Sequence, residues 1–349
     1  MKSLRILLLF VPFLVLACVP VELDNIEAFR YTFPELETVK PLPDPAPVKP
    51  APVPFVAGEI VVTKDADELV VDVIEAVIDD NITQENLDVI EVFSNVTPEV
   101  KTDKLIETVT NNWIQGVLSG TIQPSVDLVK VAEEFKKDPF MKSYLPQLQF
   151  PKVNGVTVGG RLLPLEEAYE EEIGFESPEL RLSTLVTPCK TAADEAYAKN
   201  IAELERQAAN QRTQIKNFYD PLRAAANTEY ANRIVERTGV IASNTQRLSE
   251  FIFVFNSAVD DLDYPLNVIR GLKIYVVAFV IDLRGQIVIW SNAFELAAQI
   301  ERDLKISNIN KLQEDEEKKI AANLKAALDE QKSIYNKAVN NCHNQGAGG

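Results

Sequence analysis

The apolar residues between positions 60 and 150 recur at spacings of three and four, as they do in helices that bury one face. Capping and turn residues divide this stretch into four predicted helices, which begin near Asp65, Gln84, Thr97 and Ser125. Gly120 ends the third and longest of them. Asp138 ends the fourth, because the residue before a proline is pushed away from helical angles. We therefore predict a small helical bundle over residues 60–150.

A longer apolar pattern runs from Cys189 to Cys342. One stripe, over residues 197–262, alternates steps of four and three, which is the seam spacing of a coiled coil. A second helical stripe runs over residues 296–334. They predict two helices of about 70 residues, each on the order of 100 Å long. Pro221 should kink the first helix rather than end it, because the stripe is intact on both sides.

The turn between the two long helices is predicted at Tyr264 and Pro265. Pro265 lies midway between Cys189 and Cys342, so an antiparallel hairpin folded there brings the two cysteines together at its open end. We expect a disulfide between them, since exported proteins permit such bonds, and two unpaired thiols are the alternative. So long a closed loop stabilises by roughly 4 to 5 kcal/mol on the chain-entropy model. The predicted fold class is all-α, a small helical bundle followed by a long antiparallel helical hairpin over residues 189–342.

The half of the hairpin nearest the turn carries more apolar side chains than one seam can cover. These side chains are Phe251, Phe253, Phe255, Tyr275, Val277 and Phe279. A two-helix hairpin buries one stripe per helix, so the six residues need another cover and are our candidate interaction surface. The 60–150 bundle is the favoured cover, and a second protein or a membrane are the alternatives. A rival interpretation makes residues 273–281 and 286–290 two strands, because β-branched residues cluster there.

Residues 18–59 are predicted to be a proline-rich tether. Seven prolines between Pro41 and Pro54 favour extended polyproline II. At about 3.1 Å per residue, this run would hold the body roughly 40 Å from whatever the N-terminus is attached to. A ligand for a proline-recognising domain is the alternative interpretation.

Residues 151–188 are predicted to be an acidic, irregular connector. Asn154 and Gly155 are a turn signal for a small β-hairpin, and seven glutamates lie between Glu166 and Glu179. No loop in this segment has the alternating acidic ligands and central glycine of a calcium site. We therefore expect a solvated segment.

Reactive side chains are few in this chain of 349 residues. His343 is the only histidine, and it falls in a Gly-rich segment over residues 343–349 that is expected to be a flexible tail. No Cys-x-x-Cys pair, P-loop or Gly-x-Gly-x-x-Gly motif occurs. We expect no catalytic residues, no metal site and no cofactor, and interpret the protein as non-enzymatic. The formal net charge of −17 disfavours nucleic acid as a partner, because that affinity comes mostly from Lys and Arg.

Residues 1–17 have the order of an export signal, with Lys2 and Arg5 before an apolar run that is too short to span a bilayer. Removal of this segment lowers the formal charge from −17 to −19, because both cations leave with it. The last residues of the signal and the cysteine after it resemble a bacterial lipobox, through Leu14, Val15, Leu16, Ala17 and Cys18. The resemblance implies a protein outside the cytoplasm, either secreted or lipid-anchored at the cell surface through Cys18.

An apolar tongue between two long helices resembles the layout of the α-helical pore-forming toxins. The resemblance implies a membrane-active protein with its tongue at residues 266–290. Charged residues interrupt this stretch and make membrane insertion costly, namely Arg270, Lys273, Asp282 and Arg284. Our leading interpretation is an exported spacer and interaction protein with an unidentified protein partner, and the membrane-active protein is the alternative.

Overall fold

The computed structural model describes residues 31–96, 101–159 and 188–345. Most of them are helical, as predicted, and two very long helices dominate, α9 (Pro188–Asp261) and α10 (Leu266–Gln345). The chain divides into two compact units. Unit 1 combines Met1–Asp44, Glu176–Arg212 and Lys319–Gly349, and unit 2 combines Pro45–Phe175 and Thr213–Lys318. Each unit therefore contains part of both long helices.

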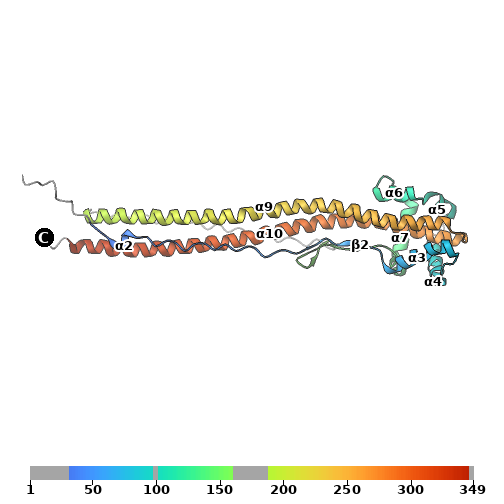
Figure 1. Ribbon diagram of the computed structural model, residues 1–349, viewed down its shortest axis with the longest axis horizontal. Coiled ribbons are helices and arrows are strands. Elements are labelled where there is room, and N and C mark those ends of the chain that lie inside the picture. The colour runs from blue at the N-terminus through green and yellow to red at the C-terminus, as the bar shows by residue number, and fades with distance from the viewer. Residues whose placement is uncertain (1–30, 97–100, 160–187, 346–349) are drawn as a thin grey trace, which may run out of the picture. The chain divides into compact units, whose positions relative to one another are not determined.

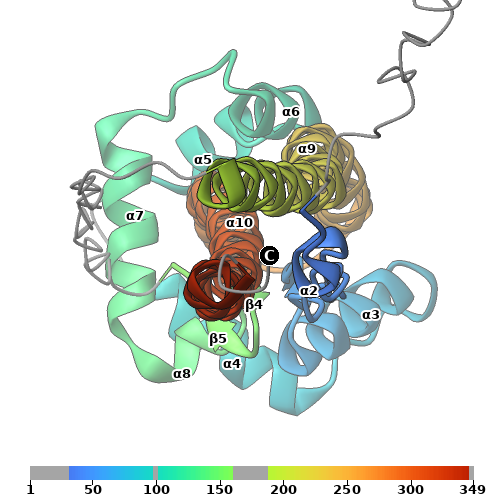
Figure 2. The same cartoon turned by 90° about the vertical axis from the view of Figure 1, so that its left-hand side faces the viewer.

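The predicted bundle lies in unit 2 and packs around the turn-proximal parts of α9 and α10 (Figure 1). Figure 2 shows the short helices distributed on different sides of this helix pair. They are α3 (Lys64–Asp79), α4 (Gln84–Ser94), α5 (Thr102–Thr108), α6 (Asn111–Ser119), α7 (Val126–Lys137) and α8 (Pro139–Lys142). Hydroxyl side chains cap the first turns of four of them, namely Thr63, Thr83, Thr110 and Ser125.

The third predicted helix is two helices in the structure. Val109 leaves the helical region with ψ of 73°, and Thr110 then accepts a hydrogen bond from the backbone N–H of Trp113, which starts α6. The predicted start of this element at Thr97 lies outside the described residues. Gly120 ends α6 in the left-handed conformation, as expected of a helix C-terminus.

The two long helices and their turn are as predicted. α9 ends at Asp261 and α10 begins at Leu266, so Tyr264 and Pro265 lie in the turn. α9 continues through Pro221. The rival prediction of strands over residues 273–290 is wrong, because α10 is continuous there and all ten residues from Gly271 to Val280 are buried.

α10 also continues to Gln345, so His343 lies in its last turn and the predicted flexible tail does not begin at residue 343.

Five short strands occur among the described residues. They are β1 (Phe55–Val56), β2 (Glu59–Val61), β3 (Gln147–Gln149), β4 (Lys152–Val153) and β5 (Val156–Thr157). β4 and β5 form the predicted hairpin, with Asn154 and Gly155 both at positive φ in its turn. β1 pairs antiparallel with β4, and β2 pairs antiparallel with β3. β1 and the start of β2 belong to the segment predicted to be a free tether, and the acidic part of the predicted connector lies outside the described residues.

The main hydrophobic core lies in unit 2, where the short helices cover the turn-proximal halves of α9 and α10. Phe93, Phe135 and Phe255 surround the ring of Tyr275 at centroid distances of 5.4 to 6.3 Å. α4 packs closely on α10 at Gly271, where a Cβ atom would lie 2.3 Å from the carbonyl oxygen of Ile90. Only glycine permits this contact, which brings the bundle close against the hairpin.

Candidate functional site

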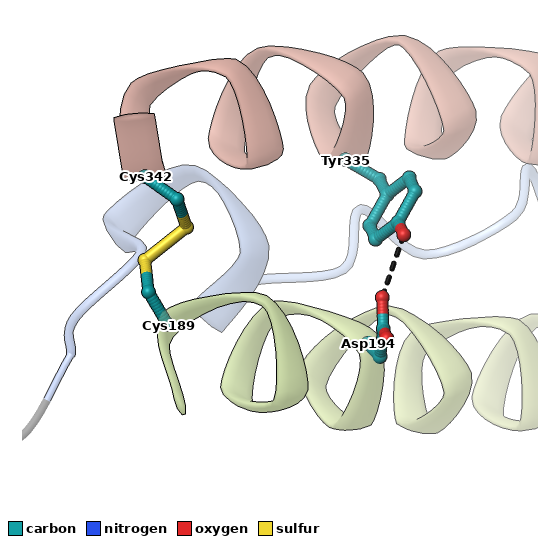
Figure 3. The surroundings of a disulfide bond; sticks show 4 residues. All are labelled: Cys189, Asp194, Tyr335 and Cys342. Carbon is teal, nitrogen blue, oxygen red and sulfur yellow. Dashed lines mark hydrogen bonds between the residues drawn. A yellow bond between two sulfur atoms is a disulfide. The ribbon is translucent and has the colours of Figure 1, made fainter. Parts of the chain in front are cut away.

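The open end of the hairpin is clamped in unit 1 by a disulfide. Cys189 of α9 and Cys342 of α10 are bonded with a Cα–Cα distance of 5.8 Å, as the position of Pro265 predicted. Close to the disulfide, Tyr335 points from α10 toward α9 and donates a hydrogen bond to Asp194 at 2.6 Å (Figure 3). The clamp is therefore both covalent and polar.

Asp194 is an anion held by two donors. Burial raises the pKa of its carboxyl, but hydrogen bonds from Tyr335 and Lys190 outweigh this and lower the pKa below its ordinary value. The Lys190 ammonium lies 2.9 Å from the carboxylate on the same helix. Asp194 is thus ionised at neutral pH and fixes the orientation of the Tyr335 ring.

The proline-rich segment is not a free tether in the described region. We call residues 33–57 the strap. In unit 1 the strap begins with the single helical turn α2 (Pro34–Glu37) and then continues extended. Leu36 is 2% exposed and packs against Ala193 of α9 and Ala338 of α10. Leu42 is 5% exposed, so the prediction of a tether that stands away from the body is wrong for this part of the chain.

Side-chain amides of α9 bind the strap backbone in unit 1. Asn200 donates to the carbonyl of Leu36 at 2.8 Å, and Gln211 donates to the carbonyl of Pro43 at 3.0 Å. Gln207 accepts from the Leu42 N–H at 2.9 Å. An extended proline-rich chain has no internal hydrogen bonds, so its carbonyls are free to accept them from these amides.

Glu203 positions one of these amides. Its carboxylate accepts hydrogen bonds from Arg206 and from the amide nitrogen of Gln207, which together lower its pKa to about 2. With its nitrogen held there, Gln207 presents its oxygen to the N–H of Leu42. If the Gln207 amide were flipped, its NH2 group would face the N–H of Leu42 and could not accept this hydrogen bond.

In unit 2 the strap is held by aromatic side chains. Tyr219 donates to the carbonyl of Val48 at 3.2 Å, and Trp290 donates to the carbonyl of Ala57 at 3.1 Å. The ring of Phe55 meets Phe294 of α10 edge to face, and the guanidinium of Arg233 lies 4.3 Å from the centre of the same ring. The strap is therefore bound in each unit by side chains of the long helices.

The candidate interaction surface near the turn is covered by the chain itself. Phe255, Tyr275, Val277 and Phe279 are completely buried in the unit 2 core, and Phe251 and Phe253 are half-buried beside it. The favoured cover, the bundle, is the one observed. The expectation that these six residues form an open interaction surface is wrong.

A buried charge lies at the junction of the bundle and the hairpin. Lys273 is completely buried, and its ammonium donates to the carbonyl of Val109 at 3.1 Å, to the Asn256 side chain at 2.9 Å, and to Asp260. Burial lowers the pKa of Lys273, and the hydrogen bond and charge of Asp260 oppose this shift. Three acceptors match the three donors of an ammonium, so the lysine is a structural cation.

The strap was not predicted because its prolines were interpreted as a stiff, extended spacer. Its apolar residues in unit 1 nevertheless repeat at a spacing of three, through Phe33, Leu36, Val39 and Leu42. In the structure Leu36 and Leu42 are buried and Phe33 and Val39 are half-buried, so this spacing marks the side of the segment that packs on the long helices. That repeat is the signal that could have revealed a docked segment.

No protein-family model, curated protein or solved structure matches the chain. Within residues 31–96, 101–159 and 188–345, no helix has an apolar stretch long enough to cross a membrane. The same residues hold no group of three or more His, Cys, Asp or Glu side chains arranged to bind a metal ion. Cys18, the candidate lipidation site, lies outside the described residues, and so do the residues that resemble a lipobox.

Proposed function

We propose that this is an exported, non-enzymatic spacer and interaction protein that presents a disulfide-clamped helical hairpin. The observation that carries the proposal is the continuity of α9 and α10, which are 74 and 80 residues long, are bonded through Cys189 and Cys342, and contribute to both units. Helices this long, packed on each other, offer an extended and regularly spaced surface. The short helices and the strap pack against these two long helices.

The disulfide also supports export, since such bonds persist in oxidising compartments. The predicted signal over residues 1–17 agrees with this location. In unit 1 the strap lies near the clamp, because Leu36 packs on Ala193 and Ala338. A lipid on Cys18 would attach the protein through the segment that precedes the strap.

Fractionation of the native host cells tests the location. We expect the protein outside the cytoplasm, oxidised at Cys189 and Cys342, with an N-terminus that begins at Cys18. Mass analysis of the N-terminal peptide distinguishes a diacylated or triacylated Cys18 from a free end, and Cys18→Ala should release a lipidated form from the membrane fraction. Recovery in the cytoplasm with both thiols free contradicts the proposal.

A membrane-active protein is the second candidate, and one observation favours it. The ten residues Gly271–Val280 are all buried and, apart from Lys273, carry no charge, so the bundle shields an apolar stretch beside the turn. Dye leakage from liposomes separates the two candidates. We expect the oxidised mature chain to leave vesicles intact, because Lys273 and Asp282 make insertion of this stretch unfavourable. Leakage at low protein concentration would favour the second candidate.

A further inference from the structure

Unit 1 contains a site that binds the first part of the strap, which is the helical turn α2 followed by an extended run to residue 44. Three of its amide side chains, Asn200, Gln211 and Gln331, are at least nine-tenths buried. Asn200 and Gln211 donate to strap carbonyls, and Gln331 accepts from the amide of Asn200 at 3.1 Å. Buried amides are unfavourable when their hydrogen bonds are lost, so the site requires an occupant. We call these three amides, with Gln207, Ala193 and Ala338, the strap site.

The strap site recognises backbone and only two large side chains. The amides of the site contact backbone groups of Leu36, Leu42 and Pro43, which any extended chain supplies. Leu36 and Leu42 are the buried anchors, while Thr38, Lys40 and Pro41 between them are exposed. The chemistry therefore selects a segment in which a helical turn leads into an extended run, with leucines six positions apart.

The strap does not fill its site tightly. One hollow beside α2 is lined by Ala196, Lys199 and Glu203 of α9, and a second is lined by Ile334, Lys337 and Asn341 of α10. Residues 33–44 also precede Cys189, so they lie outside the loop that the disulfide closes. The strap can leave and return without breaking a covalent bond or opening the hairpin.

From these observations we infer that the strap site also binds in trans, and that its partner there is residues 33–44 of a second copy of this chain. The second copy carries the same two leucines and the same free carbonyls. Exchange of straps replaces each contact within one chain by the same contact between chains, so little binding energy is lost. The high negative charge of both copies opposes their approach, so exchange should increase with salt concentration.

This inference rests on the proposed function, because it names the partner of the hairpin. Its test uses the full mature chain with its own strap disabled by Leu36→Asp and Leu42→Asp, and the probe is a labelled peptide of residues 31–44. We expect the peptide to bind this variant roughly tenfold more tightly than it binds the wild-type chain, whose own strap competes for the site. Gln211→Leu in the same background should weaken binding by about tenfold. Asn210→Leu, which changes an exposed amide on the same helix, should not.

A mixture of two variants tests exchange between copies. One chain carries the disabled strap, and the other keeps its strap but has Asn200→Leu and Gln211→Leu in its site. We expect a one-to-one complex on size exclusion with light scattering, and more of it at high salt. A milder strap variant, Leu36→Ala with Leu42→Ala, and circular dichroism establish that the hairpin is folded. Failure of both folded strap variants to bind the peptide, or of the mixture to associate, overturns the inference, whereas the location and leakage tests of the proposed function are unaffected.

Discussion

The ammonium of Lys273 lies 2.9 Å from the side-chain oxygen of Asn256, with neither residue exposed to solvent. The two residues face each other from α10 and α9 near the turn. Asn256 in turn donates to the side chain of Asn111 at 3.0 Å, so the pair joins both long helices to the start of α6. A polar contact thus connects the bundle to the hairpin inside an otherwise apolar core.

Asp260→Asn should destabilise the protein, because it removes the negative charge that faces this buried ammonium. Breaking a buried pair costs about 3 to 5 kcal/mol, but the Asp260 side chain is 46% exposed, so we expect a loss of about 1 to 2 kcal/mol. Urea unfolding at pH 7 measures it. Asp261→Asn is the matched control and should change little. Adding Lys273→Met to Asp260→Asn should restore stability, and a further loss would contradict this account.

Two glycines of α10 should respond to alanine in opposite directions. Gly271→Ala places a methyl group against the backbone of Ile90 and should lower the free energy of unfolding by about 2 to 3 kcal/mol. At Gly285 an added methyl group would have no neighbouring atom within 4 Å, so Gly285→Ala should raise it by about 0.5 to 1 kcal/mol through helix propensity. Thermal unfolding of the two variants compares them. Equal effects would show that α4 does not pack closely on α10.

Replacement of two tyrosines by phenylalanine should also change the free energy of unfolding in opposite directions. The hydroxyl of Tyr275 is buried with no hydrogen-bond partner among the described residues, and burial raises its pKa strongly. Tyr275→Phe should therefore stabilise by about 1 kcal/mol, because it removes an unsatisfied polar group. Tyr219→Phe removes the hydrogen bond to the strap carbonyl of Val48 and should destabilise by about 1 kcal/mol. Chemical denaturation measures both, and destabilisation by Tyr275→Phe would indicate a partner for its hydroxyl.

Local signals were sufficient for most of the helices. Ser125, Gly120 and Pro265 each set an element boundary through the conformation of their own neighbours, which is why those boundaries were predictable. The strap depends instead on Asn200, which is 164 residues from Leu36. Burial of Lys273 similarly requires hydrogen-bond acceptors from Val109 and Asn256. No local sequence pattern predicts that these distant acceptors contact the lysine.

The clamp should show a pH dependence that comes from Asp194. Its folded pKa lies below the ordinary value of 3.8, so the carboxylate adds stability above that pH and loses it as the pH falls through the folded pKa. Tyr335→Phe should cost about 1 kcal/mol at pH 7 and less at an acidic pH below the folded pKa of Asp194, because the carboxylate is then protonated. Guanidinium melts at the two pH values measure the difference. Tyr197→Phe, on the ring that packs 4.6 Å from Tyr335, is the control and should show no such trend.

Loss of the disulfide should affect unit 1 most. Cys189 and Cys342 are 153 residues apart, and closing so long a loop stabilises by about 5 kcal/mol on the chain-entropy model. Cys189→Ser with Cys342→Ser should therefore lower stability and increase amide exchange near Asp194 and Tyr335 first. Hydrogen exchange with peptide mapping resolves this. Unchanged amide exchange at those positions would mean that the hydrogen bond between Tyr335 and Asp194 holds this end of the hairpin closed without the disulfide. Recovery of both cysteines as free thiols from the native protein would contradict the prediction.

The strap has a consequence for how the molecule matures. Chains emerge from the ribosome N-terminus first, so residues 33–44 are synthesised long before Asn200 and Gln211, which bind their carbonyls. Contacts so distant in sequence form slowly. The strap therefore remains undocked until nearly the whole hairpin has been made, and its leucines are available to other proteins throughout that interval. Unit 1 is accordingly the last region to reach its final state, and a folding factor that binds extended apolar segments would act there first.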